Sequence, residues 1–257
     1  VLERKLARTG LITTEGFRDV LELGRRTRPQ PYGMIGRFIP VIPRDLRLEV
    51  PERMDAGGRV LTALDEEAVA RAVAALRDAG CESLVIHFLH SYANPAHERR
   101  VVELALAAGF EEVVASHVVA PLIGLIARGD SAVADAYLSP TLLRHLHAFR
   151  SETAARHGDV PLLAMQSNGG LVDPQGFRGI NAVLSGPAGG VVALAAIGSG
   201  AGRERLVGFD MGGTSTDVSL VDRAIPRSTD SRVGEFPVRL PVIDIHTVGA
   251  GGGSIAF

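Results

Sequence analysis

The sequence of 257 residues predicts an α/β fold, and three observations support this prediction. Between residues 65 and 116, helical periodicity alternates with short apolar stretches, which is typical of an α/β layer. Residues 81–89 contain a continuous apolar run, as expected of a parallel strand that is covered on both faces. Polar loops rich in glycine follow several apolar stretches, and open α/β sheets bind ligands at such loops.

The first segments predict a strand, a helix and a long connection. Residues 10–13 fit the end of a strand. Thr13 or Thr14 can cap a helix over residues 16–23, with Glu15 in its first turn. Residues 28–43 contain four prolines and therefore predict a long connection.

The middle of the chain predicts a hairpin followed by alternating helices and strands. Residues 47–50 and 59–62 flank Asp55-Ala-Gly-Gly58, which indicates a hairpin with a longer loop. Asp65 is expected to cap a helix in which Val69, Val73 and Leu76 recur at helical spacing. Asn94 is expected to cap the next helix, with Pro95 in its first turn, and that helix ends at Gly109. A strand is predicted at residues 112–116.

The second half begins with mostly helical residues 119–157, which we expect to be interrupted at Gly129 and at Ser139-Pro140. Residues 161–165 then predict a strand that ends at the polar loop Gln166-Ser-Asn-Gly-Gly170, where Ser167 and Asn168 are candidate substrate ligands. Residues 186–198 predict a helix of small side chains that can lie close to a neighbouring backbone. Residues 242–245 predict another strand.

The most informative segment is Asp210-Met-Gly-Gly-Thr-Ser-Thr-Asp217, between the apolar stretches 205–209 and 218–221. This pattern predicts a strand, a tight turn and a strand. Gly212 and Gly213 can bring backbone N–H groups close to an anion, and Thr214, Ser215 and Thr216 add hydroxyl donors. Asp210 and Asp217 suit a divalent cation or its waters. The segment therefore predicts a phosphate site with a bound metal, although Gly-Gly between strands also fits an ordinary hairpin turn.

A second glycine cluster, Thr247-Val-Gly-Ala-Gly-Gly-Gly-Ser254, follows the strand predicted at 242–245. Such a cluster fits a flexible loop as well as an anion cradle that opens a helix. Asp244 and His246 precede it, and His246 is a candidate metal ligand, although a lone histidine on a strand is more often a hydrogen-bonded core residue.

Several of these segments resemble the hydantoinase A/5-oxoprolinase family, within the actin, hexokinase and chaperone-ATPase superfamily. Phe209–Leu220 resembles the second phosphate-binding hairpin of that family. The other similar segments occur in family order and cover essentially the whole chain: Leu2–Lys5, Arg8–Leu21, Met165–Leu171, Ser185–Val192 and Asp244–Ile255.

The resemblance implies an actin/hexokinase/chaperone-ATPase-like (ribonuclease H-like) fold, incomplete at both ends. It implies that residues 1–43 end an N-terminal hydantoinase/oxoprolinase region and its connection, and that residues 44–257 form a truncated hydantoinase A-type ATPase core. It also implies an ATP site with Mg²⁺ or another divalent metal, in which Asp210 and Asp217 have catalytic roles. The implied nucleotide contacts are Gly186, Gly189, Gly212, Gly213, Thr214, Ser215, Thr216, Gly249, Gly251, Gly252, Gly253 and Ser254.

The implied activity is ATP-dependent ring opening, in which a cyclic amide oxygen is phosphorylated and a hydantoinase B-type partner subunit or domain acts next, in a hetero-oligomer. As an internal fragment, the chain is expected to be inactive and to bind ATP weakly. Residues 118–138 depart from the pattern of hydantoin and oxoproline cleavage, and Asp130 and Asp135 in this stretch are candidate substrate ligands. An ATP-dependent ketone carboxylase subunit of the acetone or acetophenone type, and a non-catalytic nucleotide-binding or structural subunit, therefore remain alternatives.

Composition limits the other classes of function. The formal net charge is −2, with 27 basic and 29 acidic residues spread along the sequence, so no basic stripe predicts nucleic-acid binding. The single cysteine, Cys81, precedes a predicted strand and is interpreted as a buried structural thiol in a reducing compartment. No apolar run reaches the roughly 18 residues that a membrane span needs. We therefore expect a cytoplasmic protein without a membrane partner.

Overall fold

This computed structural model describes residues 7–24, 39–229, 231–233 and 236–255. The chain divides into two compact units. Unit 1 comprises Val1–His145 and Arg232–Arg239, and unit 2 comprises Leu146–Ser231 and Leu240–Phe257. The predicted connection over residues 28–43 lies mostly outside the described residues, which resume at residue 39.

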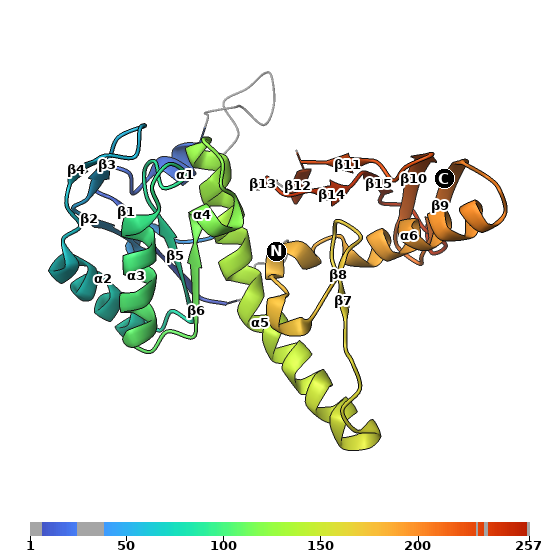
Figure 1. Cartoon of the computed structure of the whole chain (residues 1–257), viewed down its shortest axis with the longest axis horizontal. Coiled ribbons are helices and arrows are strands. Elements are labelled where there is room, and N and C mark those ends of the chain that lie inside the picture. The colour runs from blue at the N-terminus through green and yellow to red at the C-terminus, as the bar shows by residue number, and fades with distance from the viewer. Residues whose placement is uncertain (1–6, 25–38, 230, 234–235, 256–257) are drawn as a thin grey trace. The chain divides into compact units, whose positions relative to one another are not determined.

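Unit 1 is built on a parallel sheet of four strands in the order β2-β1-β5-β6 (Figure 1). The strands are β1 (Thr9–Thr14), β2 (Arg47–Val50), β5 (Ser83–His87) and β6 (Glu112–Ala115). All residues of β1 and β5 are buried, as the apolar run at 81–89 predicted. Helices α2 (Glu66–Asp78) and α3 (Ala96–Ala107) pack against each other beside this sheet. The predicted α/β class is therefore confirmed.

The N-terminal ends of α2 and α3 were predicted with different accuracy. Asp65 caps α2, because its Oδ1 accepts the N–H of Ala68 at 2.8 Å. In α3 the cap position belongs to Pro95, one residue later than predicted, although Asn94 Oδ1 still accepts the Ala96 N–H at 3.0 Å. After α3 the chain turns at Gly109 with a φ of 92°, a conformation that favours glycine.

The helix predicted over residues 16–23 is wrong in its first half. Only α1 (Val20–Leu23) is helical, and Asp19 takes its cap position. Thr13 and Thr14 do not cap it, because their hydroxyls donate to distant acceptors, the His87 carbonyl at 2.8 Å and the Glu52 carboxylate. The chain instead leaves β1 through a turn that contains Gly16, with a φ of 86°.

The predicted hairpin is correct in its turn and wrong in one of its strands. Asp55–Gly58 does connect two antiparallel strands, but these are β3 (Arg53–Met54) and β4 (Val60–Thr62). Residues 47–50 instead form β2 and pair in parallel with β1. Strand pairing between distant segments is not visible in local turn patterns, and this explains the error.

The predicted helix interruptions at Gly129 and Ser139-Pro140 are also wrong. After α4 (Ser116–Val119), α5 (Leu125–His157) continues for 33 residues with Pro140 inside it. Gly129 is required by packing, since a Cβ there would lie 2.6 Å from Leu21 Cδ2 and 2.7 Å from His87 Cε1.

Unit 2 contains an antiparallel sheet in the order β15-β10-β9 and the helix α6 (Ser185–Gly200), which packs against it. The strands are β9 (Arg205–Met211), β10 (Thr216–Asp222) and β15 (Ile245–Val248). Ala188, Val191, Val221 and Ile243 form the buried core, which Leu194 and Leu206 among others extend.

The remaining elements are short. The strand predicted at 161–165 is reduced to β7 (Ala164–Met165), which pairs with β8 (Leu171–Val172), because the Gln166 N–H donates to the Gly170 carbonyl and closes the loop. The strand predicted at 242–245 is divided at Asp244 between β14 (Val242–Ile243) and β15. The other elements are η1 (Arg44–Leu46), η2 (Pro174–Gly176), η3 (Gly179–Ala182), β11 (Arg227–Ser228), which pairs with β14, and β12 (Ser231–Val233), which pairs with β13 (Phe236–Val238).

Cys81 is buried with 8% of its surface exposed, and this burial raises the pKa of its thiol. The interpretation of Cys81 as a structural thiol is consistent with this position. Within the part of the chain that the structure describes, no helix has both the length and the apolar character that crossing a bilayer requires.

Candidate functional site

The predicted phosphate hairpin is formed by β9 and β10, which are joined by residues 212–215 (Figure 1). Seven residue pairs connect the two strands, from Thr216↔Met211 to Asp222↔Arg205. The turn is closed by the Gly212 N–H, which donates to the Ser215 carbonyl at 2.9 Å. The predicted order of strand, tight turn and strand is confirmed.

Asp210, Asp217 and Thr247 form a row across three strands. Asp217 lies opposite Asp210 on β9 and opposite Thr247 on β15. Directly opposite residues of antiparallel strands share a face and have Cβ atoms about 4.5–5.5 Å apart. The Thr247 hydroxyl donates to Asp217 Oδ1 at 2.6 Å, whereas Asp210 is exposed. Two carboxylates therefore lie side by side at the end of the hairpin.

The turn presents unused donors beside these carboxylates. The N–H groups of Gly213 and Thr214 have no hydrogen-bond acceptor among the residues that the structure describes. A Cβ placed on Gly213 would meet no atom within 4 Å, so space is open next to the turn. The Thr216 hydroxyl is engaged, because it donates to the Ala250 carbonyl at 2.6 Å, so Thr214 and Ser215 have the freer hydroxyls.

The second glycine loop is tied to the turn of the hairpin. The N–H groups of Gly252 and Gly253 donate to the carbonyls of Gly212 and Gly213, each at 2.9 Å. A Cβ on Gly251 would lie 2.6 Å from the Gly212 carbonyl oxygen and 2.7 Å from the Thr214 nitrogen. These glycines therefore support the turn through their backbones.

Ser254 and Gly249 differ in their surroundings. The Ser254 hydroxyl accepts the Gly251 N–H at 3.0 Å, which rigidifies the loop from inside. Gly249 borders open space. Residues 256–257, which follow this loop, lie outside the described residues, so the helix expected after it stays a prediction.

The second turn of α6 approaches the hairpin at Gly190. A Cβ on Gly190 would be 3.7 Å from Asp210 Oδ2, whereas one on Gly186 would meet no atom within 4 Å. Gly189 lies near Met165 instead. A helix of 16 residues has a partial positive charge at its N-terminal end, which in α6 begins at Ser185, more than one turn before Gly190.

His246 is not brought together with the two aspartates. It lies opposite Val218 in the sheet, one residue out of step with the row of Asp217 and Thr247. Because side chains alternate between the faces of a strand, His246 projects from the opposite face. In the part of the chain that the structure describes, no group of three or more His, Cys, Asp or Glu side chains could hold a metal ion.

Ser167 and Asn168 mainly support their own loop. The buried Ser167 hydroxyl donates to the Asn181 carbonyl at 2.6 Å and accepts the Leu184 N–H at 3.0 Å. Asn168 Oδ1 accepts the Gly170 N–H at 2.7 Å. Substrate contact by these two side chains stays a prediction.

Asp130 and Asp135 are both on α5 and both buried, within unit 1. Burial raises the pKa of Asp130 to about 7. Asp135 accepts a hydrogen bond from the Ser139 hydroxyl at 3.2 Å, one helical turn later. Asp130 can therefore exchange a proton near neutral pH, whereas the role of Asp135 in substrate binding stays a prediction.

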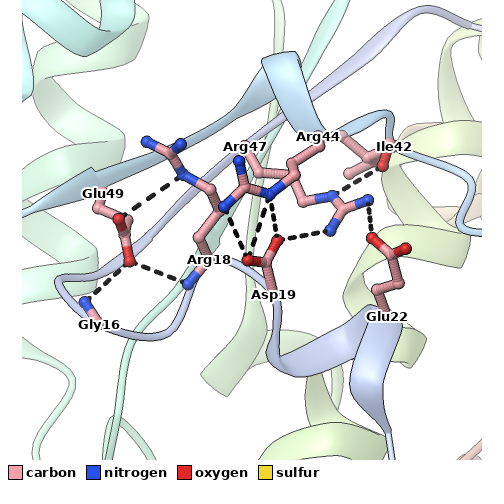
Figure 2. Close-up of polar contacts among 8 residues, drawn as sticks. All are labelled: Gly16, Arg18, Asp19, Glu22, Ile42, Arg44, Arg47 and Glu49. Atoms are coloured by element: carbon pink, nitrogen blue, oxygen red, sulfur yellow. Dashed lines mark hydrogen bonds and ion pairs between the residues drawn. The ribbon is translucent and has the colours of Figure 1, made fainter.

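A cavity of about 630 Å³ that the sequence did not predict lies beside the loop after β1. Figure 2 shows its charged walls: Glu49 accepts the N–H groups of Gly16 and Arg18, and Asp19 forms a bidentate pair with Arg44. The buried Arg47 contacts Asp19 and Glu22. Three guanidinium groups face three carboxylates, so the cluster is balanced in charge and fixes the loop against β2.

Comparison with known families decides the assignment. The hydantoinase/oxoprolinase profile matches residues 128–257, and the profile of the hydantoinase/oxoprolinase N-terminal region matches residues 1–109. The chain belongs to the hydantoinase/oxoprolinase family. Within the family profile fall most of α5, all of α6, the β9–β10 hairpin and both glycine loops. The domain boundary expected after residue 43 stays a prediction.

Relatives and solved structures are similar to this chain along nearly its whole length. 5-Oxoprolinase 1 of Arabidopsis thaliana is 37% identical over 99% of this chain, which spans 22% of that protein. The structure of an ATP-dependent caprolactamase from Pseudomonas jessenii has a TM-score of 0.86 and 30% identity, covering 100% of this chain and 38% of that one. A nucleotide-free acetone carboxylase structure has a TM-score of 0.83 and 28% identity, covering 97% and 37%.

Sequence reasoning missed two residues of the hydantoinase/oxoprolinase hairpin site. Thr247 was recognised only as the start of a glycine-rich segment, and Gly190 only as one small residue of a helix. The alternation of side chains along the strand at 245–248 could have placed Thr247 on one face, but not opposite Asp217, because the register is set by the fold.

Proposed function

We propose that the chain is the ATP-binding part of an ATP-dependent hydrolase of the hydantoinase and 5-oxoprolinase type, which opens cyclic amides. The observation that carries this proposal is the pair Asp210 and Asp217, side by side at the glycine turn of the hairpin. Membership of the family and the likeness to a 5-oxoprolinase and a caprolactamase support it.

Asp210 and Asp217 fit a divalent cation. Like charges directly opposite each other on neighbouring strands are destabilising, and a shared cation removes that repulsion. Carboxylate oxygens are the ligands that Mg²⁺ prefers, usually together with water and phosphate oxygens. When bound, Mg²⁺ or another divalent ion would neutralise charge on the phosphates of ATP. Thr247 would keep Asp217 oriented through its hydroxyl.

The turn and α6 would hold the phosphates. The free N–H groups of Gly213 and Thr214, with the hydroxyls of Thr214 and Ser215, would bind oxygens of the β- and γ-phosphates. The amide oxygen of the substrate would attack the γ-phosphorus as the bond to ADP breaks, and the phosphorylated amide would then be hydrolysed. Positioning and charge neutralisation would supply most of the rate.

Further parts of the proposal extend beyond the hairpin. We infer an actin/hexokinase-type fold for the complete protein, a hydantoinase B-type partner subunit or domain that carries out the later steps, and a cytoplasmic location. The parallel sheet and the glycine-lined hairpin support the fold, the much greater length of the relatives supports a further domain, and the single cysteine of the sequence fits a reducing compartment.

Replacing Asp210 tests the assignment. In the complete protein, Asp210→Ala should abolish ATP turnover that is stimulated by 5-oxoproline or a related cyclic amide. Asp222→Ala is the matched control, because Asp222 is an exposed residue at the other end of the same hairpin. Retained turnover in Asp210→Ala would refute the nucleotide site.

A ketone carboxylase is the second candidate, and the likeness to acetone carboxylase favours it specifically. Stimulation of ATP turnover by acetone or acetophenone with bicarbonate, and none by cyclic amides, would replace the hydrolase by this alternative. An absence of any nucleotide binding in the complete protein would identify a non-catalytic subunit.

A further inference from the structure

The charged cavity beside the loop after β1 has no role in the proposed function. Its volume of about 630 Å³ is within the usual range for sites that bind small molecules. Four charged side chains contribute to its lining, Arg18, Asp19, Arg44 and Glu49, and all of its lining residues belong to unit 1. The loop that supplies most of the lining follows the carboxyl end of β1, and open α/β sheets bind ligands at this edge.

The carboxylates of this cavity are already engaged. Glu49 Oε1 accepts two backbone N–H groups of the loop at 2.8 and 3.0 Å, and Glu49 Oε2 lies 3.6 Å from Arg18 Nε. Both oxygens of Asp19 accept from Arg44 at 2.9–3.2 Å, and Asp19 Oδ1 lies 3.3 Å from Arg47 Nη1. The hydrogen bond from Arg44 holds the pKa of Asp19 below its usual value, so Asp19 stays charged at neutral pH. The two carboxylates therefore position the arginines.

Two of the arginines keep donors that no carboxylate uses. Both terminal nitrogens of Arg18, and Nη1 of Arg44, have no hydrogen-bond or ion-pair partner among the residues that the structure describes. In Figure 2 the outer end of the Arg18 guanidinium points away from Glu49, and one terminal nitrogen of Arg44 points away from Asp19. The buried Arg47 differs, because each of its three guanidinium nitrogens has a partner. The cavity therefore offers unused donors to an anion, whereas its carboxylates are paired.

Another part of the lining is apolar and consists of Phe17, Val20 and Leu23. The Arg53 guanidinium lies 5.1 Å from the centre of the Phe17 ring, and this contact helps to hold the ring in place. Leu23 has 53% of its surface exposed. An inorganic anion would leave these side chains in contact with water, whereas a short chain of methylene groups would cover them, and removal of apolar surface from water is favourable.

We propose that this cavity binds a small organic carboxylate with a short apolar chain. The carboxylate accepts N–H groups of Arg18 and Arg44, because planar guanidinium groups match the geometry of the two carboxylate oxygens. The chain lies against Phe17, Val20 and Leu23. The site requires no residue of the phosphate hairpin, so it can be tested independently of the proposed function.

Hexanoate is the probe, and isothermal titration calorimetry with the complete protein measures its dissociation constant. Arg18→Gln should raise this constant roughly 10–100-fold, the usual effect of losing a hydrogen bond to a charged group. The melting temperature should stay unchanged, because the backbone N–H of residue 18 still donates to Glu49. Arg71→Gln is the matched control and should bind hexanoate normally, because Arg71 is an exposed arginine of α2 that does not line this cavity.

Leu23→Glu and Leu23→Gln provide a second test that leaves every arginine in place. Because Leu23 is largely exposed, neither substitution should lower the melting temperature. The added carboxylate repels hexanoate, so Leu23→Glu should weaken binding several-fold more than Leu23→Gln. Hexanol lacks the charge and inorganic phosphate lacks the chain, so each should bind more weakly than hexanoate. An absence of hexanoate binding, equal affinity for hexanol or phosphate, or full affinity in Arg18→Gln or in Leu23→Glu would overturn the proposal.

Discussion

Asp130 and His87 have pKa values displaced in opposite directions by the same cause. Burial raises the pKa of Asp130 from 3.8 to about 7 and lowers that of His87 from 6.5 to about 4. Both groups are therefore neutral in the folded protein over much of the range between pH 4 and 6.5. As the pH rises, Asp130 loses its proton in the unfolded chain before it does so in the folded protein. As the pH falls, His87 gains a proton in the unfolded chain before it does so in the folded protein.

Asp130→Asn should raise the free energy of unfolding at pH 8. Between about pH 4 and 7 the folded state keeps a proton that the unfolded state has released, so stability falls as the pH rises and stays lowered above pH 7. Each unit of pKa displacement corresponds to about 1.4 kcal/mol. Urea unfolding at pH 3.5 and pH 8 measures the difference, which should be small at the lower pH.

His87→Gln is the complementary variant, with the sign reversed. The wild-type His87 contributes stability that increases from pH 4 to pH 6.5, since the unfolded state binds a proton there and the folded state does not. The variant should lose this rise. An unchanged pH dependence in both variants would contradict the displaced pKa values.

Gly251→Ala should damage the hairpin site, and Gly249→Ala should not. The new Cβ at residue 251 would collide with the backbone of Gly212, Gly213 and Thr214, whereas the one at residue 249 meets open space. Overpacking costs typically about 1–3 kcal/mol, so the KM for ATP in the complete protein should rise several-fold or more in Gly251→Ala alone. Equal effects of both substitutions would show that the close approach is unimportant.

At the scale of elements, α2 offers a local test. Asp65→Ala removes the acceptor of the Ala68 N–H and should lower the free energy of unfolding by about 0.5–2 kcal/mol. Asp65→Ser keeps an acceptor and should restore most of the loss. Thermal unfolding followed by circular dichroism measures both variants, and equal stability of Asp65→Ala and wild type would refute the cap.

Elements whose signals are local were predictable from the sequence. The apolar run of β5, the cap of α2 and the glycine turn of the β9–β10 hairpin each depend on neighbouring residues. In contrast, Gly129 and Ser139-Pro140 were predicted to interrupt the helix, whereas tertiary packing keeps α5 continuous through both.

The candidate site likewise contains features that local residue types predict and features that depend on long-range contacts. Residue types alone identified the aspartates, glycines and hydroxyls of the turn. The partner of Asp217 and the hydrogen bonds between the glycine loop and the turn depend on strand register and on contacts between distant segments. These long-range contacts could not be read from one sequence.

At the scale of the whole molecule, one face of the antiparallel sheet in unit 2 is apolar and exposed. Val207, Phe209 and Leu220 each have more than 60% of their surface exposed. We expect the 257-residue chain to self-associate through this face, since contiguous exposed apolar residues often mark an interaction surface. Sedimentation velocity should show less association for the double variant Phe209→Thr/Leu220→Thr.

The neighbouring residue on the other face provides the control for that variant. Val221 belongs to the buried core, so Val221→Thr should lower the melting temperature without reducing association. The double variant on the exposed face should leave the unfolding free energy within about 0.5 kcal/mol. Association that persists in the double variant would exclude this face as its cause.

The hydrogen bonds of Gly252 and Gly253 to the turn make nucleotide binding measurable by amide hydrogen exchange. Their two amide protons can exchange with solvent only when the loop separates from the carbonyls of Gly212 and Gly213. A nucleotide bound at the turn would slow that separation. The exchange rates of two identifiable protons would thus report occupancy of the hairpin directly, before any product is formed and without a label on the nucleotide.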